Sequence, residues 1–514
     1  MSTPEALFKR IKDKLGRDGI VAFLSAFVCG LLVHMPALTF DVPNHDGLDS
    51  LYFDQNMITS GRWFLGLTCG ISSYYALPWV TGLLALIYIS VAGVFICKLL
   101  GIKRESFVIL TGCILVTFPS IASNFAYAFT MDGYMLGLLL SVLAVYAVDK
   151  CSFGFIIGGL LLAFDMGTYQ AYVSVAMVLS LFKVLEIWHD EKKDRKISST
   201  ARYLGMGVIG LGLYYGILKA LLALTHKTLD TYQGISDAGL ASGGLFSGIK
   251  QVYSDFVSFT IRSRIMFANV YAGIALILLL LAFMITVFAV VIKHGLWTKP
   301  VLYISVAVSG ILFPVCANGI LFVSPGVTYH LLMRYQWVLF PVMMLAFIER
   351  NTEPAGLKSV LDWAAVCSVT VVSFSFALSD NIAYSNLEKK YEKTYAYTLR
   401  LVDRIEQTEG FYRDIPIRFI GVVGTDPYPE TDYTKEVTGS MLSVSGDHLL
   451  YKPENYALFI KNYLGVTLNI QPSGANDFYY EDWYVDMPSF PAAGSIVIKD
   501  GVMYIKTENS ERNQ

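Results

Sequence analysis

Residues 20–40 read IVAFLSAFVCGLLVHMPALTF, and residues 41–63, which follow directly, read DVPNHDGLDSLYFDQNMITSGRW. The first stretch is apolar and about as long as the roughly 20 residues that an α-helix needs to cross the hydrocarbon of a bilayer. It is too long for the core of a signal peptide, and it lacks a cleavage-like site of small residues. We therefore expect a retained membrane span that leads into a polar connection.

The composition extends this expectation to most of the chain. Of its 514 residues, 54% are hydrophobic and 16% are charged, and the mean hydropathy of +0.52 is too high for a soluble protein of this size. The formal net charge of −2 indicates no concentrated basic surface, so we expect no nucleic-acid partner. The seven cysteines are irregularly spaced without a CxxC pair, which argues against a disulfide framework and a zinc site.

Apolar runs predict about eleven transmembrane helices. They lie near residues 20–39, 79–98, 106–124, 132–149, 153–165, 168–187, 202–224, 267–292, 300–323, 333–349 and 358–379. If the short fifth run fused with the sixth, Asp165 and Gln170 would lie at mid-membrane. With eleven spans, the connections on the N-terminal side hold 19 Lys and Arg residues against 6 on the other side, which fits a cytoplasmic N-terminus. We therefore expect two short helices that meet near Asp165.

The predicted fold is thus a mostly α polytopic membrane domain, residues 1–379, followed by a soluble α/β domain, residues 380–514, on the extracytoplasmic side. This second part has no membrane-length run, and its acids outnumber Lys and Arg by 20 to 13. Residues 386–409 have a helical apolar period, IRFIGVV (417–423) is typical of a buried strand, and Asp500-Gly501 indicates a hairpin. It has no Gly-rich phosphate loop, GxSxG motif or metal-ligand spacing, so we do not expect a second enzyme.

Acids at the outer side are candidate catalytic residues. Asp46 and Asp49 lie in the first outer loop, and Asp132 lies in FTMDGYMLG. Charged groups near membrane depth are costly unless they are paired or wetted, which favours a polar cavity open to this side. An aspartate is ionised at neutral pH and can act as a base. The alternatives are a solvated connection for the loop and a helix cap for Asp132.

Cations on the same side are candidate ligands of a donor phosphate. These are Arg62 in SGRW, and His330 and Arg334 in YHLLMRYQW. Arginine stays charged and binds phosphate through a fixed fork of N–H groups. Carboxylates and arginines together suit the transfer of a sugar from a lipid-linked phosphate, which needs a base for the acceptor and cations for the departing phosphate. Several acids could also hold a divalent metal, but Arg62 offers positive charge without one, so we expect no metal or other cofactor.

Aromatic rings beside acids form a further candidate site in NDFYYEDWYVDMPSFP. Flat rings stack on the C–H faces of a sugar while carboxylates accept hydrogen bonds from its hydroxyls, so Tyr480, Trp483 and Tyr484 are predicted to bind the acceptor or the sugar. The alternative is that these rings pack the domain against the membrane surface, where Trp and Tyr are enriched.

The chain resembles the bacterial membrane glucosyltransferases of the serotype-converting O-antigen type, within the GT-C superfamily. The residues that carry the resemblance are NHDGLD and SGRWFLGL in the first outer loop, MDGY, TYQAY, and MPSFPAAGSIVIKDGVMYIK near the end. The resemblance implies a polyprenyl-phosphate-linked sugar, usually glucose, an envelope polysaccharide as acceptor, inversion at the anomeric carbon, and action at the outer face of the bacterial cytoplasmic membrane. It also implies a flippase and a synthase for the lipid-linked sugar as partners.

In the family the catalytic acid lies in the first outer loop, which here gives Asp46, with Asp49 second. Gly47 and Leu48 separate the two acids, where several relatives have an adjacent pair, so both stay candidates. Two other classes of function compete. A transporter or flippase for a lipid-linked glycan would favour internal repeats, which the halves do not show clearly, and a sensor with a passive membrane anchor would not need eleven spans.

Overall fold

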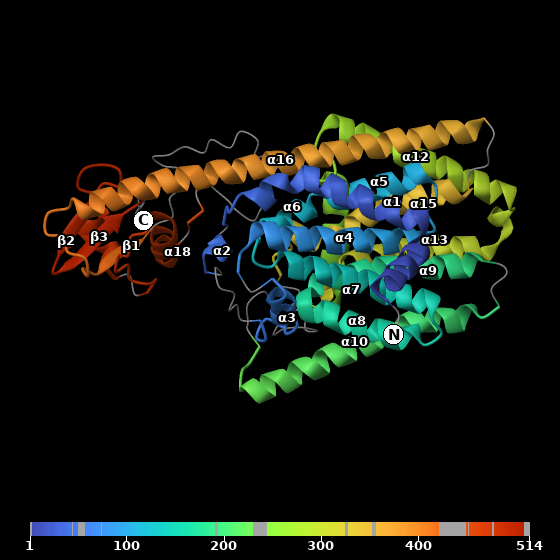
Figure 1. The fold of residues 1–514 in the computed structure, drawn as a ribbon, viewed down its shortest axis with the longest axis horizontal. Coiled ribbons are helices and arrows are strands. Elements are labelled where there is room, and N and C mark those ends of the chain that lie inside the picture. Colours follow the sequence, from blue (N-terminus) through green and yellow to red (C-terminus); the bar gives the residue numbers. More distant parts are fainter. Residues whose placement is uncertain are drawn as a thin grey trace.

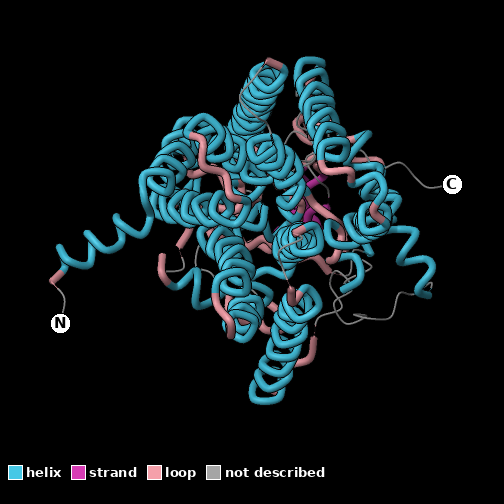
Figure 2. The backbone as a smooth tube through the Cα atoms, turned by 90° about the vertical axis from the view of Figure 1, so that its right-hand side faces the viewer, coloured by secondary structure: helices cyan, strands magenta, loops and turns pink. Residues whose placement is uncertain are grey.

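A computed structural model of the chain describes residues 3–43, 45–49, 57–72, 75–190, 194–229, 244–323, 327–351, 356–420, 441, 449–450, 452–474 and 477–507. Most of these residues are helical. The helices lie side by side in one bundle, and a small region with a three-stranded sheet lies beyond one end of it (Figure 1). Viewed from the opposite end, most of the bundle helices are seen nearly end-on (Figure 2).

Eight helical segments of the described residues are long and apolar enough to cross a membrane. They are Lys12–Thr39 of α1 (Pro4–Thr39), α4 (Pro78–Leu100), α7 (Met131–Lys150), the segment Gly154–His189, α10 (Lys196–Thr225), α12 (Val270–Lys293), α13 (Pro300–Ala317), and Ser359–Glu406 of α16 (Leu357–Glu406). The prediction of a polytopic, mostly helical protein is therefore confirmed.

The segment Gly154–His189 contains two helices that run in opposite directions. α8 (Gly154–Tyr169) is followed by η1 (Gln170–Tyr172) and α9 (Val173–His189), and Tyr169 has an extended backbone. Near the end of α9, Lys183 pairs with Asp149 at the end of α7, with 3.2 Å between Nζ and Oδ1. α8 begins only four residues after α7 ends, at this same end of the bundle. The chain therefore reverses at η1, as expected for two short helices rather than one fused span.

Two predicted spans are shorter than expected. α5 (Glu105–Thr117) and α15 (Leu339–Asn351) have 13 residues each. α5 ends because Pro119 disfavours the helical conformation of the residue before it, and Phe118 is extended; the short α6 (Ser120–Phe125) follows. The two 3₁₀ turns η5 (Leu331–Met333) and η6 (Tyr335–Val338) precede α15. The remaining short elements of the bundle are α3 (Leu65–Gly70), α11 (Gly244–Val257), the π-helix η3 (Ser258–Arg262), η4 (Leu296–Thr298) and α14 (Ile320–Val323).

α16 is a continuous helix of 50 residues that leaves the bundle and enters the C-terminal region (Figure 1). The predicted last span and the predicted amphipathic helix after it are parts of this one helix. It is followed by β1 (Ile417–Ile420), α18 (Pro453–Phe459), η7 (Ile460–Leu464), η8 (Asp477–Tyr480), α19 (Asp482–Val485), β2 (Ile496–Lys499) and β3 (Val502–Lys506).

The sheet has the order β1-β3-β2, with β1 parallel and β2 antiparallel to β3. The predicted hairpin is confirmed, because Asp500 and Gly501 join β2 to β3 with φ angles of 53° and 77°. The predicted strand at 417–423 is confirmed for β1, and its last three residues lie outside the described part of the chain.

Ion pairs gather at the end of the bundle opposite the C-terminal region. Arg104 contacts Asp362 through two hydrogen bonds of 2.5 and 3.0 Å, and Arg350 pairs with Glu186. The first loop after α1, with the short helix α2 (His45–Asp49), lies at the other end together with α3 and the sheet (Figure 1). The ion pairs of Arg104 and Arg350 therefore lie at one end of the bundle, and the helix that contains Asp46 lies at the other.

Candidate active site

The turn that precedes Arg62 is clamped from two sides. Gly61 has φ +75°, a conformation that favours glycine. The Tyr214 hydroxyl of α10 donates to the Gly61 carbonyl at 3.1 Å, and Gln170 Nε2 donates to the Ser60 carbonyl at 3.1 Å. A Cβ atom at Gly61 would lie 2.6 Å from Tyr214 Oη and 2.7 Å from Gln170 Nε2. Backbone and side chains therefore fix this turn closely.

This turn holds Arg62 against two stacked tyrosines. Arg62 Nη1 donates to the Tyr134 hydroxyl at 3.2 Å, and the guanidinium carbon lies 5.3 Å from the centre of the Tyr169 ring. The Tyr134 and Tyr169 rings stack with centroids 4.3 Å apart. Arg62 is half-buried and lies beside the start of α7 and the end of α8, where these two tyrosines are.

The residue after Arg62 completes the attachment of the turn. A Cβ at Gly167 would lie 2.6 Å from Trp63 Cε2, so the indole packs directly on the α8 backbone. Phe64 stacks on Phe164 with ring centroids 4.6 Å apart, and its N–H donates to the Gly167 carbonyl at 2.7 Å. Trp63 thus packs on α8. The contacts of Trp63 and Phe64 with this helix fix the position of Arg62 in the SGRW motif.

Asp46 lies near the same tyrosine. It is half-buried in α2, and both Asp46 and Arg62 lie within electrostatic range of the Tyr134 hydroxyl. The side chain of Asp49, in the same short helix, lies outside the described part of the structure. The structure therefore brings two residues of the first loop, one acid and one arginine, to the start of α7.

Asp132 is buried in the first turn of α7. Thr130 occupies the N-cap position, so Asp132 does not cap this helix. Among the described residues, neither carboxylate oxygen of Asp132 has a partner with full hydrogen-bond geometry, and the Ser72 side chain and the Gly133 N–H are the polar groups beside it. Cys69 of α3 lies within electrostatic range of both Asp132 and Tyr134. Asp132 is thus next to the group that contains Arg62.

Helix α2 is anchored in the C-terminal region. Leu48 is 1% exposed and belongs to the same buried cluster as Tyr456 and Phe459 of α18 and Leu401 of α16. Burying a leucine side chain contributes about 1.5–3 kcal/mol. The position of the loop that carries Asp46 therefore depends on a core that the C-terminal region supplies.

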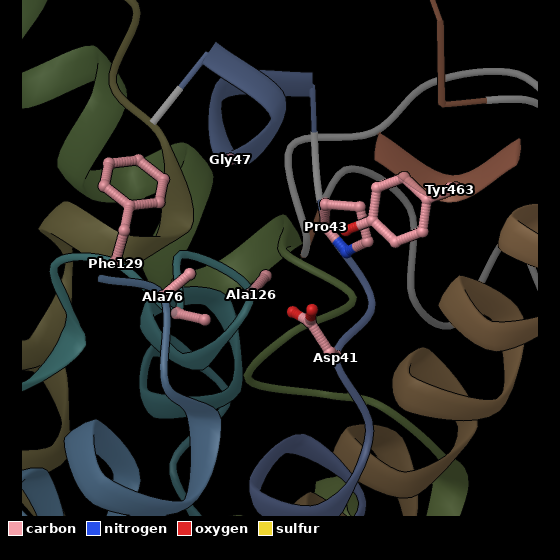
Figure 3. Close-up of a pocket in the computed structure, with 8 residues that line it drawn as sticks. Asp41, Pro43, Gly47, Ala76, Ala126, Phe129 and Tyr463 are labelled. Carbon is pink, nitrogen blue, oxygen red and sulfur yellow. The ribbon is translucent and has the colours of Figure 1, made fainter. Parts of the chain in front are cut away.

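A small pocket lies where the loop, the bundle and the C-terminal region meet (Figure 3). It is lined by Asp41, Pro43, Gly47, Ala76, Ala126, Ala128, Phe129 and Tyr463. Asp41 is exposed at the mouth of the pocket, and partial burial of its carboxyl against these walls raises its pKa above the ordinary value. Burial, and then the charge of Asp41, raise the pKa of the Tyr463 phenol.

Arg334 forms a different polar group. Its Nη1 and Nη2 donate to the two carboxylate oxygens of Asp255 at 2.7 and 2.8 Å, and its Nε donates to the Tyr329 carbonyl at 3.2 Å. The guanidinium also lies 3.8 Å from the centre of the Tyr329 ring. His330, at the N-cap of η5, is half-buried beside this group. The fork of Arg334 is thus occupied by an acid of α11 that sequence reasoning missed.

The aromatic residues of the C-terminal region have unequal environments. Tyr480 is 82% exposed. Trp483 is half-buried, with Lys499 Nζ 4.4 Å from the ring centre. Tyr484 is buried and donates to the Ile505 carbonyl at 3.2 Å. Tyr480 and Trp483 therefore remain available to a ligand, whereas Tyr484 packs inside the C-terminal region rather than against a membrane surface.

Sequence reasoning also missed Tyr134, Tyr169, Gln170 and Tyr214. The first three lie in the MDGY and TYQAY motifs. The signal that could have found them is that polar and aromatic residues recur where apolar spans end on the same side of the predicted membrane. Among the described residues, no three His, Cys, Asp or Glu side chains gather as a metal site would require.

A family model described as Glucosyl transferase GtrII matches residues 35–348, which is more than half of the chain. The protein belongs to the GtrII glucosyltransferase family. No curated protein and no solved structure matches the chain. A GtrII glucosyltransferase is a glycosyltransferase with a sugar donor and a glycan acceptor. In this GtrII protein the match includes Asp46, Arg62, Asp132 and Arg334, and it ends before α16 and the C-terminal region.

Proposed function

We propose that this GtrII glucosyltransferase moves glucose from a polyprenyl-phosphate donor to a cell-surface glycan, with inversion, at the extracytoplasmic face of the bacterial cytoplasmic membrane. The observation that supports it most directly is that Arg62 donates a hydrogen bond to the Tyr134 hydroxyl at one end of the bundle, and that the charge of Asp46 acts on the same phenol. A base and a phosphate ligand are the two groups that this transfer needs.

In the proposed step, Asp46 takes the proton of an acceptor hydroxyl, whose oxygen attacks the anomeric carbon from the face opposite the phosphate. The bond from that carbon to the phosphate oxygen breaks, and polyprenyl phosphate leaves with the bonding electron pair. The Arg62 guanidinium stabilises the charge that develops on this phosphate. Asp49 is the alternative base, and Asp132 is proposed as a second catalytic acid.

Arg334 and His330 are proposed as further phosphate ligands. For Arg334 this role requires that a phosphate replaces Asp255 on its fork. Arg62 donates a hydrogen bond to the Tyr134 phenol, on which the charge of Asp46 also acts. Because it is associated with the proposed base in this way, Arg62 is the preferred ligand.

The proposed topology has about eleven chain passes, with the N-terminus in the cytoplasm. The reversal at η1 supports it, because it adds one pass to the eight apolar segments, and α5 and α15 add two short ones. Basic residues such as Arg104, Lys183 and Arg350 lie at the end opposite the sheet. The C-terminal domain, residues 380–514, is then extracytoplasmic.

We also propose that this domain contributes to acceptor binding. Tyr480 and Trp483 present an exposed and a half-buried ring beside the Glu481 carboxylate, to which the Trp483 indole donates. Leu48 joins the domain to the loop that carries the proposed base. A flippase and a synthase for the lipid-linked sugar are the partners that such a donor requires.

The test is transfer of labelled glucose from purified polyprenyl-phosphate glucose to the cell's surface polysaccharide, with the Asp46→Asn and Asp49→Asn variants. We expect Asp46→Asn to lose at least about a hundredfold in rate, the scale of a general base. Asp403→Asn, an exposed acid of α16, is the control. Full activity of Asp46→Asn would contradict its role, and donor translocation in liposomes without transfer would favour a flippase.

A further inference from the structure

The first twelve residues of α1 form a separate helix that turns away from the bundle. It begins after Thr3, whose hydroxyl accepts the Ala6 N–H at 3.2 Å. Gly16 ends the regular helical backbone with φ 68° and ψ 174°, and the membrane segment continues beyond it. Figure 2 shows this segment projecting sideways from the bundle near the label N. The helix Pro4–Leu15 thus crosses the direction of the spans.

This helix has an apolar face that the protein leaves uncovered. At about 100° per residue, positions 7, 8, 11 and 15 share one side of a helix. Phe8 is 74% exposed and Leu7 is 52% exposed, whereas Leu15 packs against the core of the bundle. The apolar stripe therefore runs from Leu15, which contacts the bundle, outward to the exposed Phe8 and Leu7.

The rest of the helix is charged and exposed. Four basic residues, Lys9, Arg10, Lys12 and Lys14, accompany two acids, Glu5 and Asp13. The Lys14 carbonyl accepts a hydrogen bond from Lys98 Nζ at the end of α4, at 3.1 Å. A further basic residue, Lys98, thus lies at the point where this helix meets the bundle.

We propose that Pro4–Leu15 lies in the plane of the bilayer surface and binds anionic phospholipid headgroups. An amphipathic helix of this kind buries its apolar face at the boundary between headgroups and acyl chains, while flanking lysines and arginines contact negative lipids. Two observations select lipid over a protein partner. The helix continues directly into a membrane span, and its exposed charge is complementary to an anionic surface.

The test places a bimane fluorophore on either side of the helix in the full chain. Phe8→Cys carries it on the apolar face, and Lys9→Cys carries it on the charged face as the matched control. Both are made with Cys151→Ser and Cys367→Ser, because these two cysteines are exposed. The proteins are placed in nanodiscs of phosphatidylcholine, with or without about one quarter phosphatidylglycerol.

We expect brominated acyl chains to quench the fluorophore at position 8 severalfold more than at position 9, and aqueous iodide to do the reverse. Phosphatidylglycerol increases this contrast. Exchanging Arg10, Lys12 and Lys14 for glutamine in both cysteine variants removes that increase without changing the span. Equal iodide quenching at both positions would overturn the proposal, as would protection of position 8 that occurs only in discs holding two copies.

Discussion

At the scale of single residues, Gly61 has the most exacting position in the candidate site. Its left-handed backbone costs another residue about 1 kcal/mol, and its neighbours leave no room for a side chain. Arg62 follows directly, so any shift of this turn moves the guanidinium away from Tyr134.

We expect Gly61→Ala to lower transferase activity by about tenfold or more, since a cost of 1–3 kcal/mol is typical of strain at such a site. The measurement is transfer of labelled glucose at matched protein levels. Gly295→Ala is the matched control, because Gly295 also has a positive φ, of 59°, but nothing lies within 4 Å of its added Cβ. A similar loss of activity in both variants would contradict the clamping role of Tyr214 and Gln170.

Asp41 gives a prediction on pH. Burial raises its pKa in the folded protein above that of the unfolded chain, so the folded state holds the proton at pH values where the unfolded state has lost it. The contribution of Asp41 to the free energy of unfolding therefore falls as pH rises through the ordinary carboxyl range and then through the raised pKa.

Asp41→Asn removes this unfavourable ionisation. We expect the variant to have a higher Tm than the natural protein near neutral pH and an equal Tm at acid pH, measured by tryptophan fluorescence of the detergent-purified protein. A difference in Tm that does not change with pH would show that packing, and not the charge of Asp41, is responsible.

At the scale of elements, the short helix α2 depends on a partner outside the bundle. Five residues are too few for a stable isolated helix. Its Leu48 is instead buried against α18 and α16, and this contact holds the backbone that carries Asp46.

We expect Leu48→Ala to cost about 2–5 kcal/mol in the docking of α2, the usual range for a buried leucine. The kcat for transfer falls, while insertion in the membrane is unchanged because Leu48 is not part of a span. Leu48→Met, which conserves volume, keeps most of the activity. Hydrogen exchange of the α2 amides should rise in Leu48→Ala alone. Unchanged exchange with lost activity would point to a role other than docking.

At the scale of the whole molecule, the proposed orientation separates the two ends of the bundle by a membrane. Cys151 is exposed in the connection between α7 and α8, at the end opposite the sheet. Thr408 lies just after α16, in the C-terminal region.

We expect a membrane-impermeant maleimide to leave Cys151 unlabelled in intact spheroplasts and to label it after lysis. A Thr408→Cys variant should be labelled in both samples. The readout is the mass of the labelled peptides. Labelling of Cys151 in intact spheroplasts, with none at position 408, would reverse the proposed orientation.

Much of the bundle could be predicted because membrane spans are local features of a sequence. An apolar run of sufficient length has one stable environment, since its backbone groups must be paired within a helix. The distribution of Lys and Arg predicted two helices around Asp165, and the reversal at η1 agrees with it. The Asp500-Gly501 hairpin was predictable for the same reason, because a type of turn depends on its own residues.

The sequence by itself determined the class of the protein and its apolar segments, and it supplied the candidate acids, two in the first loop and Asp132 in α7. The tertiary structure decided the partners: Tyr134 and Tyr169 for Arg62, Asp255 for Arg334, and the C-terminal core for Leu48. The physical reason is range. Hydropathy and turn preference act between near neighbours in the chain, whereas ion pairs, ring stacking and side-chain burial join residues that only the packing of distant helices brings together.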